Sequence, residues 1–125
     1  REGSEGGGAV VRSDRERLLD ALDAINRIRE KVTEDLDSFL ADEMVQVWVT
    51  HHLEILGESI ARLSDELKTH YPRVPWSRAV AMRNILVHHY FSVDPRQVWN
   101  TVANDLPKLQ RDLEAILKSM PEEST

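Results

Sequence analysis

One short stretch of the sequence combines a cation, an amide, an imidazole and a phenol at helical spacing: Arg83, Asn84, His88 and Tyr90. At about 100° per residue, a helix would present these four side chains within an arc of about 160°. A guanidinium binds phosphate oxygens through a planar fork of donors, and an imidazole exchanges protons near neutral pH. The set suits metal-independent cleavage of an RNA phosphodiester, in which one group removes the 2′-hydroxyl proton and another stabilises the charge on phosphorus. From spacing alone, a histidine packed at a helix end with an arginine in a surface ion pair is the commoner arrangement, because arginine and histidine five residues apart occur often.

A single copy of this stretch supplies one imidazole from His88, whereas strand cleavage calls for a base and an acid. A symmetric dimer that faces two such helices would supply two histidines and two arginines. Such a dimer would place the reactive groups at its interface. No metal and no other cofactor is expected.

Charge is distributed unevenly along the 125 residues. The net charge of −6 argues against general binding of polyanions. Residues 71–111, however, hold six basic and two acidic side chains, so this segment carries +4 and the remainder −10. A phosphate-bearing ligand such as RNA is therefore expected near this segment.

The elements that must position these groups are helices, because apolar residues recur every three or four positions and no alternating strand pattern occurs. The prediction is an all-α, up-and-down four-helix bundle with one additional short helix, folded as a single domain over residues 13–120. Residues 1–12 and 121–125 are expected to be flexible tails. The expected helical segments are 13–32, 36–40, 42–69, 75–90 and 94–120.

Local signals mark several helix boundaries. Ser13 and Glu16 have the spacing of a capping box at the start of the first helix. Gly57 lies inside a long apolar stripe, where it is expected to let another helix approach closely. Pro107 should bend or divide the last helix near Asp105.

Several functional classes are excluded or disfavoured by what the sequence lacks. With no cysteine, the chain has no disulfide and no thiol nucleophile. No apolar run approaches the roughly 20 residues that cross a bilayer, and residues 1–8 lack the apolar stretch of a secretory signal, so a cytoplasmic protein without a membrane partner is expected. His51, Glu54 and Glu58 share a helix face, but the E-x-x-H pattern of bundle metal sites is absent. Glu58 is either a partner of Arg83 or His88 or a member of an ordinary ion pair.

The stretch from Arg83 to Tyr90 also reads as an R-x4-H-x-Y motif, and it does not stand alone. With it, the chain resembles the HepT-like branch of the HEPN superfamily over about residues 13–118. One departure is Ala81, where relatives often have glycine. The further matching segments are 53–58 (LEILGE), Tyr71-Pro72 with Pro75-Trp76, 90–94 (YFSVD), and Val98-Trp99 with 105–107 (DLP).

The resemblance implies a homodimeric, metal-independent ribonuclease that serves as the toxin of a toxin–antitoxin pair. It implies that Arg83 and His88 are the catalytic pair, that Asn84 helps to position the phosphate or the imidazole, and that Tyr90 accepts AMP from a partner minimal nucleotidyltransferase, the antitoxin. Two alternatives stay open. The chain could be a non-catalytic helical subunit that presents Tyr90 to a nucleotidyltransferase, or a plain helical dimerisation module.

Overall fold

The computed structural model of the chain describes residues 13–32, 35–89 and 92–121. Within these ranges the chain is helical and has no strand, which confirms the predicted all-α fold. The predicted tail at residues 1–12 and most of the one at 121–125 lie outside the described residues. The elements are α1 (Asp14–Lys31), α2 (Leu36–Ala41), α3 (Glu43–Ala61), α4 (Asp65–His70), α5 (Trp76–His88), α6 (Pro95–Asn100), the π-helical turn η2 (Thr101–Asp105) and α7 (Leu106–Ser119).

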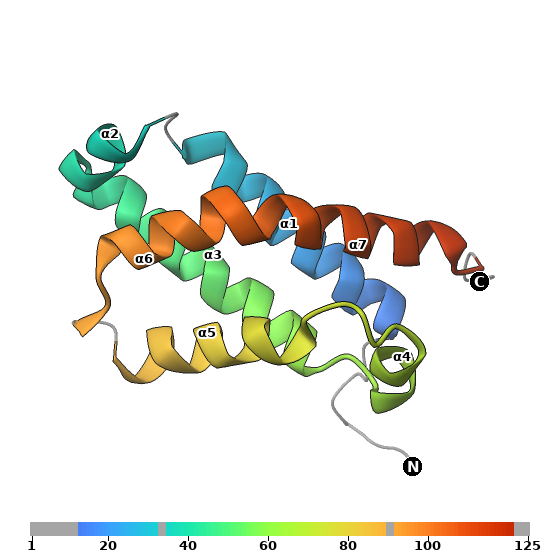
Figure 1. The fold of residues 1–125 in the computed structure, drawn as a ribbon. Helices are drawn as coiled ribbons and strands as arrows, with labels where there is room; N and C mark the ends of the chain where they lie inside the picture. The colour runs from blue at the N-terminus through green and yellow to red at the C-terminus, as the bar shows by residue number, and fades with distance from the viewer. Residues whose placement is uncertain (1–12, 33–34, 90–91, 122–125) are drawn as a thin grey trace, which may run out of the picture.

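Four long helical segments form the bundle, and α3 is its central member (Figure 1). Helix α3 packs on α1 along one side and on α5 along the other, while α6, η2 and α7 together form a nearly continuous rod that crosses α1. Leu18, Ile25, Phe39, Ile60 and Leu113 are among the side chains that are fully buried at the centre. No helix in the described ranges is both long enough and apolar enough to cross a membrane.

Helix α1 begins where the sequence predicts. The Ser13 hydroxyl accepts a hydrogen bond from the Glu16 amide at 3.1 Å, and the Glu16 carboxylate accepts one from the Ser13 amide at 3.0 Å. This capping box satisfies amides that a helix start otherwise leaves without partners. The buried face of the helix carries the predicted apolar stripe of Leu18, Leu22, Ile25 and Ile28.

The single helix predicted over residues 42–69 is wrong, because the structure contains two helices there. Helix α3 ends at Ala61, and Ser64 caps α4 by accepting a hydrogen bond from the Leu67 amide at 3.1 Å. The Asp14 carboxylate stabilises the turn between the two helices. It accepts hydrogen bonds from the Ser64 amide at 2.9 Å and from the Ser64 hydroxyl at 2.6 Å. Among the described residues, α2 and α4 are thus separate short helices, where the sequence predicts one such helix.

Two further boundaries follow from proline. Pro107 lacks an amide proton and cannot continue the α-helical hydrogen-bond ladder, and the chain just before it forms the η2 turn, which ends at Asp105 as predicted. Pro75 is the cap residue of α5, which begins at Trp76 and ends at His88 rather than at Tyr90. Tyr90 lies outside the described residues.

Candidate active site on helices α3 and α5

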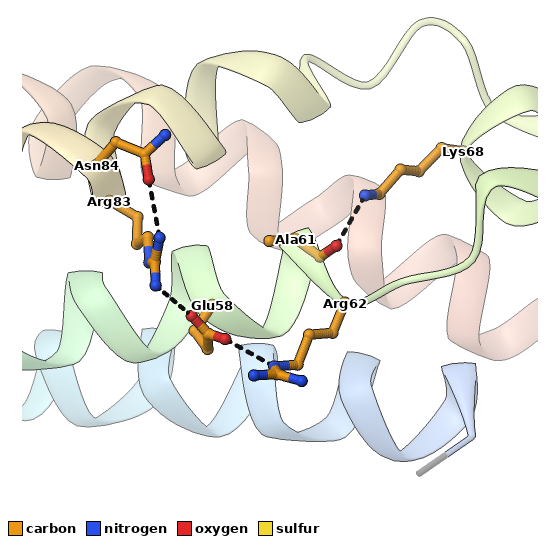
Figure 2. A network of polar contacts seen from close by, with 6 residues as sticks. All are labelled: Glu58, Ala61, Arg62, Lys68, Arg83 and Asn84. Carbon is orange, nitrogen blue, oxygen red and sulfur yellow. Dashed lines mark hydrogen bonds and ion pairs between the residues drawn. The ribbon is translucent and has the colours of Figure 1, made fainter. Parts of the chain in front are cut away.

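Arg83 is held in place by two side chains, one from each of two helices (Figure 2). Its Nη2 lies 2.7 Å from Oε2 of Glu58 on α3, and its Nη1 donates to Oδ1 of Asn84 on α5 at 2.8 Å. The Arg83 side chain is 31% exposed. Because a guanidinium has five donors, three remain available for another acceptor such as a phosphate.

Glu58 bridges two arginines. Its second carboxylate oxygen, Oε1, accepts a hydrogen bond from Nε of Arg62 at 2.6 Å. The hydrogen bond from Arg62 and the attraction of Arg83 hold the pKa of the Glu58 carboxyl below its ordinary value, although partial desolvation opposes them. At neutral pH the three groups therefore carry two positive charges and one negative charge.

Gly57 permits this arrangement. A Cβ atom added at Gly57 would overlap the Cβ of Arg83, and it would lie 2.9 Å from the Arg83 Cγ and 3.1 Å from the Ala79 carbonyl oxygen. The predicted close approach of another helix is thus confirmed, and the group that needs the space is the stem of Arg83 itself.

His88 is the last residue of α5 and is exposed. Within the described ranges its imidazole has no hydrogen bond or ion pair, and Asn84 bonds to Arg83 rather than to it. The structure thus joins Arg83 and Asn84, and it leaves His88 free on the same helix. Tyr90, the predicted AMP acceptor, lies outside the described residues.

Five cavities among the described residues are lined by side chains other than Arg83 and His88. Exposed large apolar side chains nevertheless gather on the same two helices. They are Met44, Val47 and Ile55 on α3, and Ile85 and Val87 on α5.

Arg62 is the member of this site that the sequence analysis missed, and Glu58 is the one it left open. The signal for Arg62 was available, because Glu58 and Arg62 are four residues apart and oppositely charged on one helix. The contact between Glu58 and Arg83 has no such signal, since it depends on where α5 crosses α3. The structure places Glu58 in ion pairs with both arginines.

Comparisons with known proteins agree on one family. The family described as Ribonuclease HepT-like matches residues 21–116. A Methanocaldococcus jannaschii protein that is provisionally named an RNase is 35% identical over 101 residues, which cover 79% of this chain and 92% of that protein. A Thermococcus cleftensis protein named as a probable ribonuclease HepT is 37% identical over 110 residues, or 87% of this chain and all of that one. No solved structure matches the chain.

Proposed function

Because the chain belongs to the HepT-like ribonuclease family and has its HEPN-like helical fold, we propose that it is a metal-independent endoribonuclease. Arg83 and His88 are its catalytic pair. The observation that carries the proposal is the partly exposed Arg83 guanidinium, which Glu58 and Asn84 hold from two sides. It lies on the helix that ends at His88, and among the described residues it keeps unused donors and the His88 imidazole has no polar partner.

The proposed reaction is an internal transfer within RNA. A neutral His88 removes the proton of the 2′-hydroxyl, and the 2′-oxygen attacks the neighbouring phosphorus. Arg83 binds the phosphate oxygens and stabilises the negative charge that develops on them. The bond from phosphorus to the 5′-oxygen then breaks, and a protonated imidazole donates its proton to the leaving oxygen. The products are a 2′,3′-cyclic phosphate and a 5′-hydroxyl.

The second imidazole comes from a second copy of the chain in this proposal. Ile85 and Val87 are each 45% exposed on the helix that carries Arg83, and Met44 on α3 is 81% exposed. An apolar surface of this kind supports self-association. A symmetric dimer over α3 and α5 would bring two copies of Arg83 and His88 to one interface and enclose them in a shared pocket.

Cleavage of RNA in excess EDTA tests the activity. The wild-type chain is expected to generate 2′,3′-cyclic phosphate ends without added metal. Absence of cleavage over a broad panel of cellular RNAs, by a folded and dimeric chain, would contradict the proposal. Cleavage that requires a divalent ion, or that leaves 3′-hydroxyl ends, would contradict the mechanism.

We further propose that the chain is the toxin of a pair whose antitoxin is a minimal nucleotidyltransferase that transfers AMP to Tyr90. Tyr90 follows His88 by two residues, so a phosphate bound to its phenol would bring negative charge close to the catalytic groups. Incubation with the nucleotidyltransferase of a neighbouring gene and ATP is expected to add the mass of AMP at Tyr90 and to stop RNA cleavage. A chain that gains AMP but never cleaves RNA would instead be the non-catalytic binding subunit.

A further inference from the structure

We propose that Arg62 is a second phosphate-binding residue of this ribonuclease site, and that Glu58 is the positioning residue that holds Arg62 and Arg83 side by side on one RNA strand. The inference rests on the proposed ribonuclease function and adds a substrate contact to it. The R-x4-H-x-Y motif contains neither residue, although Glu58 is the last residue of the matching segment 53–58.

The geometry of the bridge brings the two guanidiniums close together. Oε2 of Glu58 lies 2.7 Å from Nη2 of Arg83, and Oε1 of the same carboxylate lies 2.6 Å from Nε of Arg62. The two cations are therefore separated by two hydrogen bonds and the width of one carboxylate. Figure 2 shows the three side chains in a continuous row from α5 to the end of α3.

Arg62 has the exposure and the free donors that a phosphate contact needs. Its side chain is 57% exposed, and within the described residues only its Nε is engaged, so both terminal nitrogens remain available. Its backbone is fixed, because its amide donates to the Glu58 carbonyl at 3.2 Å. Lys68 of α4 secures the preceding turn by donating to the Ala61 carbonyl at 3.3 Å. Arg62 therefore starts from a defined position at the end of α3.

Arg62, Arg83 and His88 follow one another in this order along the two helices. Leu86, near the end of α5, shares a cavity with Gln46 and Thr50 of the first half of α3, whereas Ala79, near its beginning, shares one with Leu56 farther along α3. The two helices are therefore antiparallel, and Arg62 and His88 lie on opposite sides of Arg83 along them. A strand whose reacting phosphate lies between Arg83 and His88 would place a neighbouring phosphate toward Arg62.

The charges of the three groups explain why a bridge is needed. Arg83 paired with Glu58 alone would be electrically neutral and would attract a phosphodiester weakly. Arg62 restores one net positive charge, while the carboxylate keeps two like charges from repelling each other out of position. Glu58 thus orients both cations without itself touching the substrate.

Binding of an uncleavable RNA analogue tests the role of Arg62. The probe is a 2′-O-methyl version of an RNA that the wild-type chain cuts, since it lacks the attacking hydroxyl. Arg62→Gln is expected to weaken binding and to flatten the dependence of log affinity on log salt by about 0.7, the value for one lost phosphate contact on a single strand. The fall in affinity should exceed any fall in the turnover number at saturating RNA.

The matched control for Arg62→Gln is Arg27→Gln on α1. Arg27 is also an exposed arginine whose Nε binds a carboxylate four residues earlier, Asp23, at 3.0 Å. Its substitution changes the net charge equally and is expected to leave the salt dependence unchanged. Equal salt slopes for the two variants and the wild type would overturn the role of Arg62.

Glu58→Gln tests the positioning role, because the change removes a negative charge and an orienting group at once. The lost charge and the lost orientation are expected to affect RNA binding and the turnover number in different ways. Removal of a negative charge should preserve or tighten RNA binding, whereas loss of orientation should lower the turnover number roughly 10-fold to 100-fold. Asp23→Asn, which removes the same charge from the α1 pair, should leave the turnover number unchanged. A Glu58→Gln chain with wild-type turnover would overturn the positioning role, and a fall in melting temperature alone would not support it.

Failure of this inference is distinguishable from failure of the proposed function. A wild-type chain that cuts no RNA overturns the ribonuclease proposal and this inference with it. A wild-type chain that cuts RNA with cyclic phosphate ends, and whose Arg62 and Glu58 variants behave like their α1 controls, overturns this inference alone.

Discussion

The side of the bundle formed by α1 and α7 differs from the side formed by α3 and α5. On the first side the outer surface is polar, and Leu19 is the one exposed large apolar side chain found among the described residues of α1 and α7. On the second side the described residues include five such side chains, which lie on the two helices that carry Glu58 and Arg83.

The difference indicates that the α1–α7 side is a solvated surface, whereas the α3–α5 side is suited to contact with another molecule. Surface ion pairs such as Arg27 with Asp23 on α1 contribute little to stability and keep that face solvated. A face that combines exposed apolar side chains with a fixed, partly exposed cation loses solubility without gaining stability, unless another molecule covers it. The α3–α5 side therefore fits a surface completed by a second copy and by a ligand.

The largest expected effect comes from the proposed catalytic groups. His88→Ala and Arg83→Ala should each lower the rate of RNA cleavage by about 10²- to 10⁴-fold, because each removes a group that acts in the transition state. His88→Ala should leave the melting temperature nearly unchanged, since His88 is exposed. His70→Ala, an exposed histidine at the end of α4, is the control and should retain full activity. A His88→Ala chain that cleaves at the wild-type rate would remove His88 from the mechanism.

The next effect concerns self-association. Ile85 on α5 and Leu19 on α1 are both 45% exposed, so the two sides of the bundle offer a matched pair of substitutions. Ile85→Asp should weaken dimerisation by about 100-fold or more, because it buries an unpaired charge in an apolar interface. Leu19→Asp should leave the dimer intact. Sedimentation velocity measures the dimer fraction of the two variants. Equal dimer fractions would show that the interface does not lie on the α3–α5 side.

Gly57→Ala should act on both stability and activity. A helix interior ordinarily gains up to about 1 kcal/mol from this change. Here the added methyl group collides with the stem of Arg83, so a loss of about 1–3 kcal/mol is expected instead. Urea denaturation measures the sign. A Gly57→Ala variant that is more stable and cleaves RNA normally would contradict this expectation. It would show that α5 can move away from the added methyl group without loss of stability or activity.

Ser13→Ala should affect stability alone. The change removes the hydroxyl that caps α1 and should cost about 1 kcal/mol of unfolding free energy. Because α1 belongs to the side without the proposed site, the cleavage rate per folded molecule should not change. A drop in that rate would argue against the separation of the two sides.

The smallest expected effect is the pH dependence contributed by Glu58. Its pKa is lowered in the folded chain, so the ionised carboxylate favours folding above the ordinary pKa of glutamate, near 4.3. This contribution is lost as the pH falls through the lowered folded value. The difference in unfolding free energy between wild type and Glu58→Gln should therefore narrow as the pH falls from neutral through the lowered folded value. Because the group is partly exposed and screened, the gap should stay below about 1 kcal/mol. A gap that does not depend on pH would contradict this assignment.

The sequence predicts the features of this fold that local chemistry decides. The capping box at Ser13, the interruption before Pro107 and the close approach at Gly57 all depend on residues near one another in the chain or on a backbone property. Leu63 and Leu67 continue the apolar period across Ser64, so periodicity alone predicts one long helix. Asp14, fifty residues away along the chain, contributes to the break, and no local pattern reveals it.

The same distinction applies to the candidate site. The spacing of Arg83, Asn84 and His88 is visible in the sequence because the three residues share one helix. The contact between Glu58 and Arg83 is not visible in the sequence. The Glu58 carboxylate on α3 reaches Arg83 because of the angle and the close distance at which α5 crosses α3. That distance is set by Gly57, whose neighbour across the helices is again known only from the fold.

The rate of RNA cleavage per chain, measured in EDTA over a wide range of chain concentration, tests the central claim most directly. If two copies form one catalytic pocket, the rate per chain should fall in proportion to concentration below the dimer dissociation constant and level off above it. Ile85→Asp should shift that curve to higher concentration, whereas Leu19→Asp should not. A rate per chain that stays constant while sedimentation shows the dimer dissociating would contradict the account.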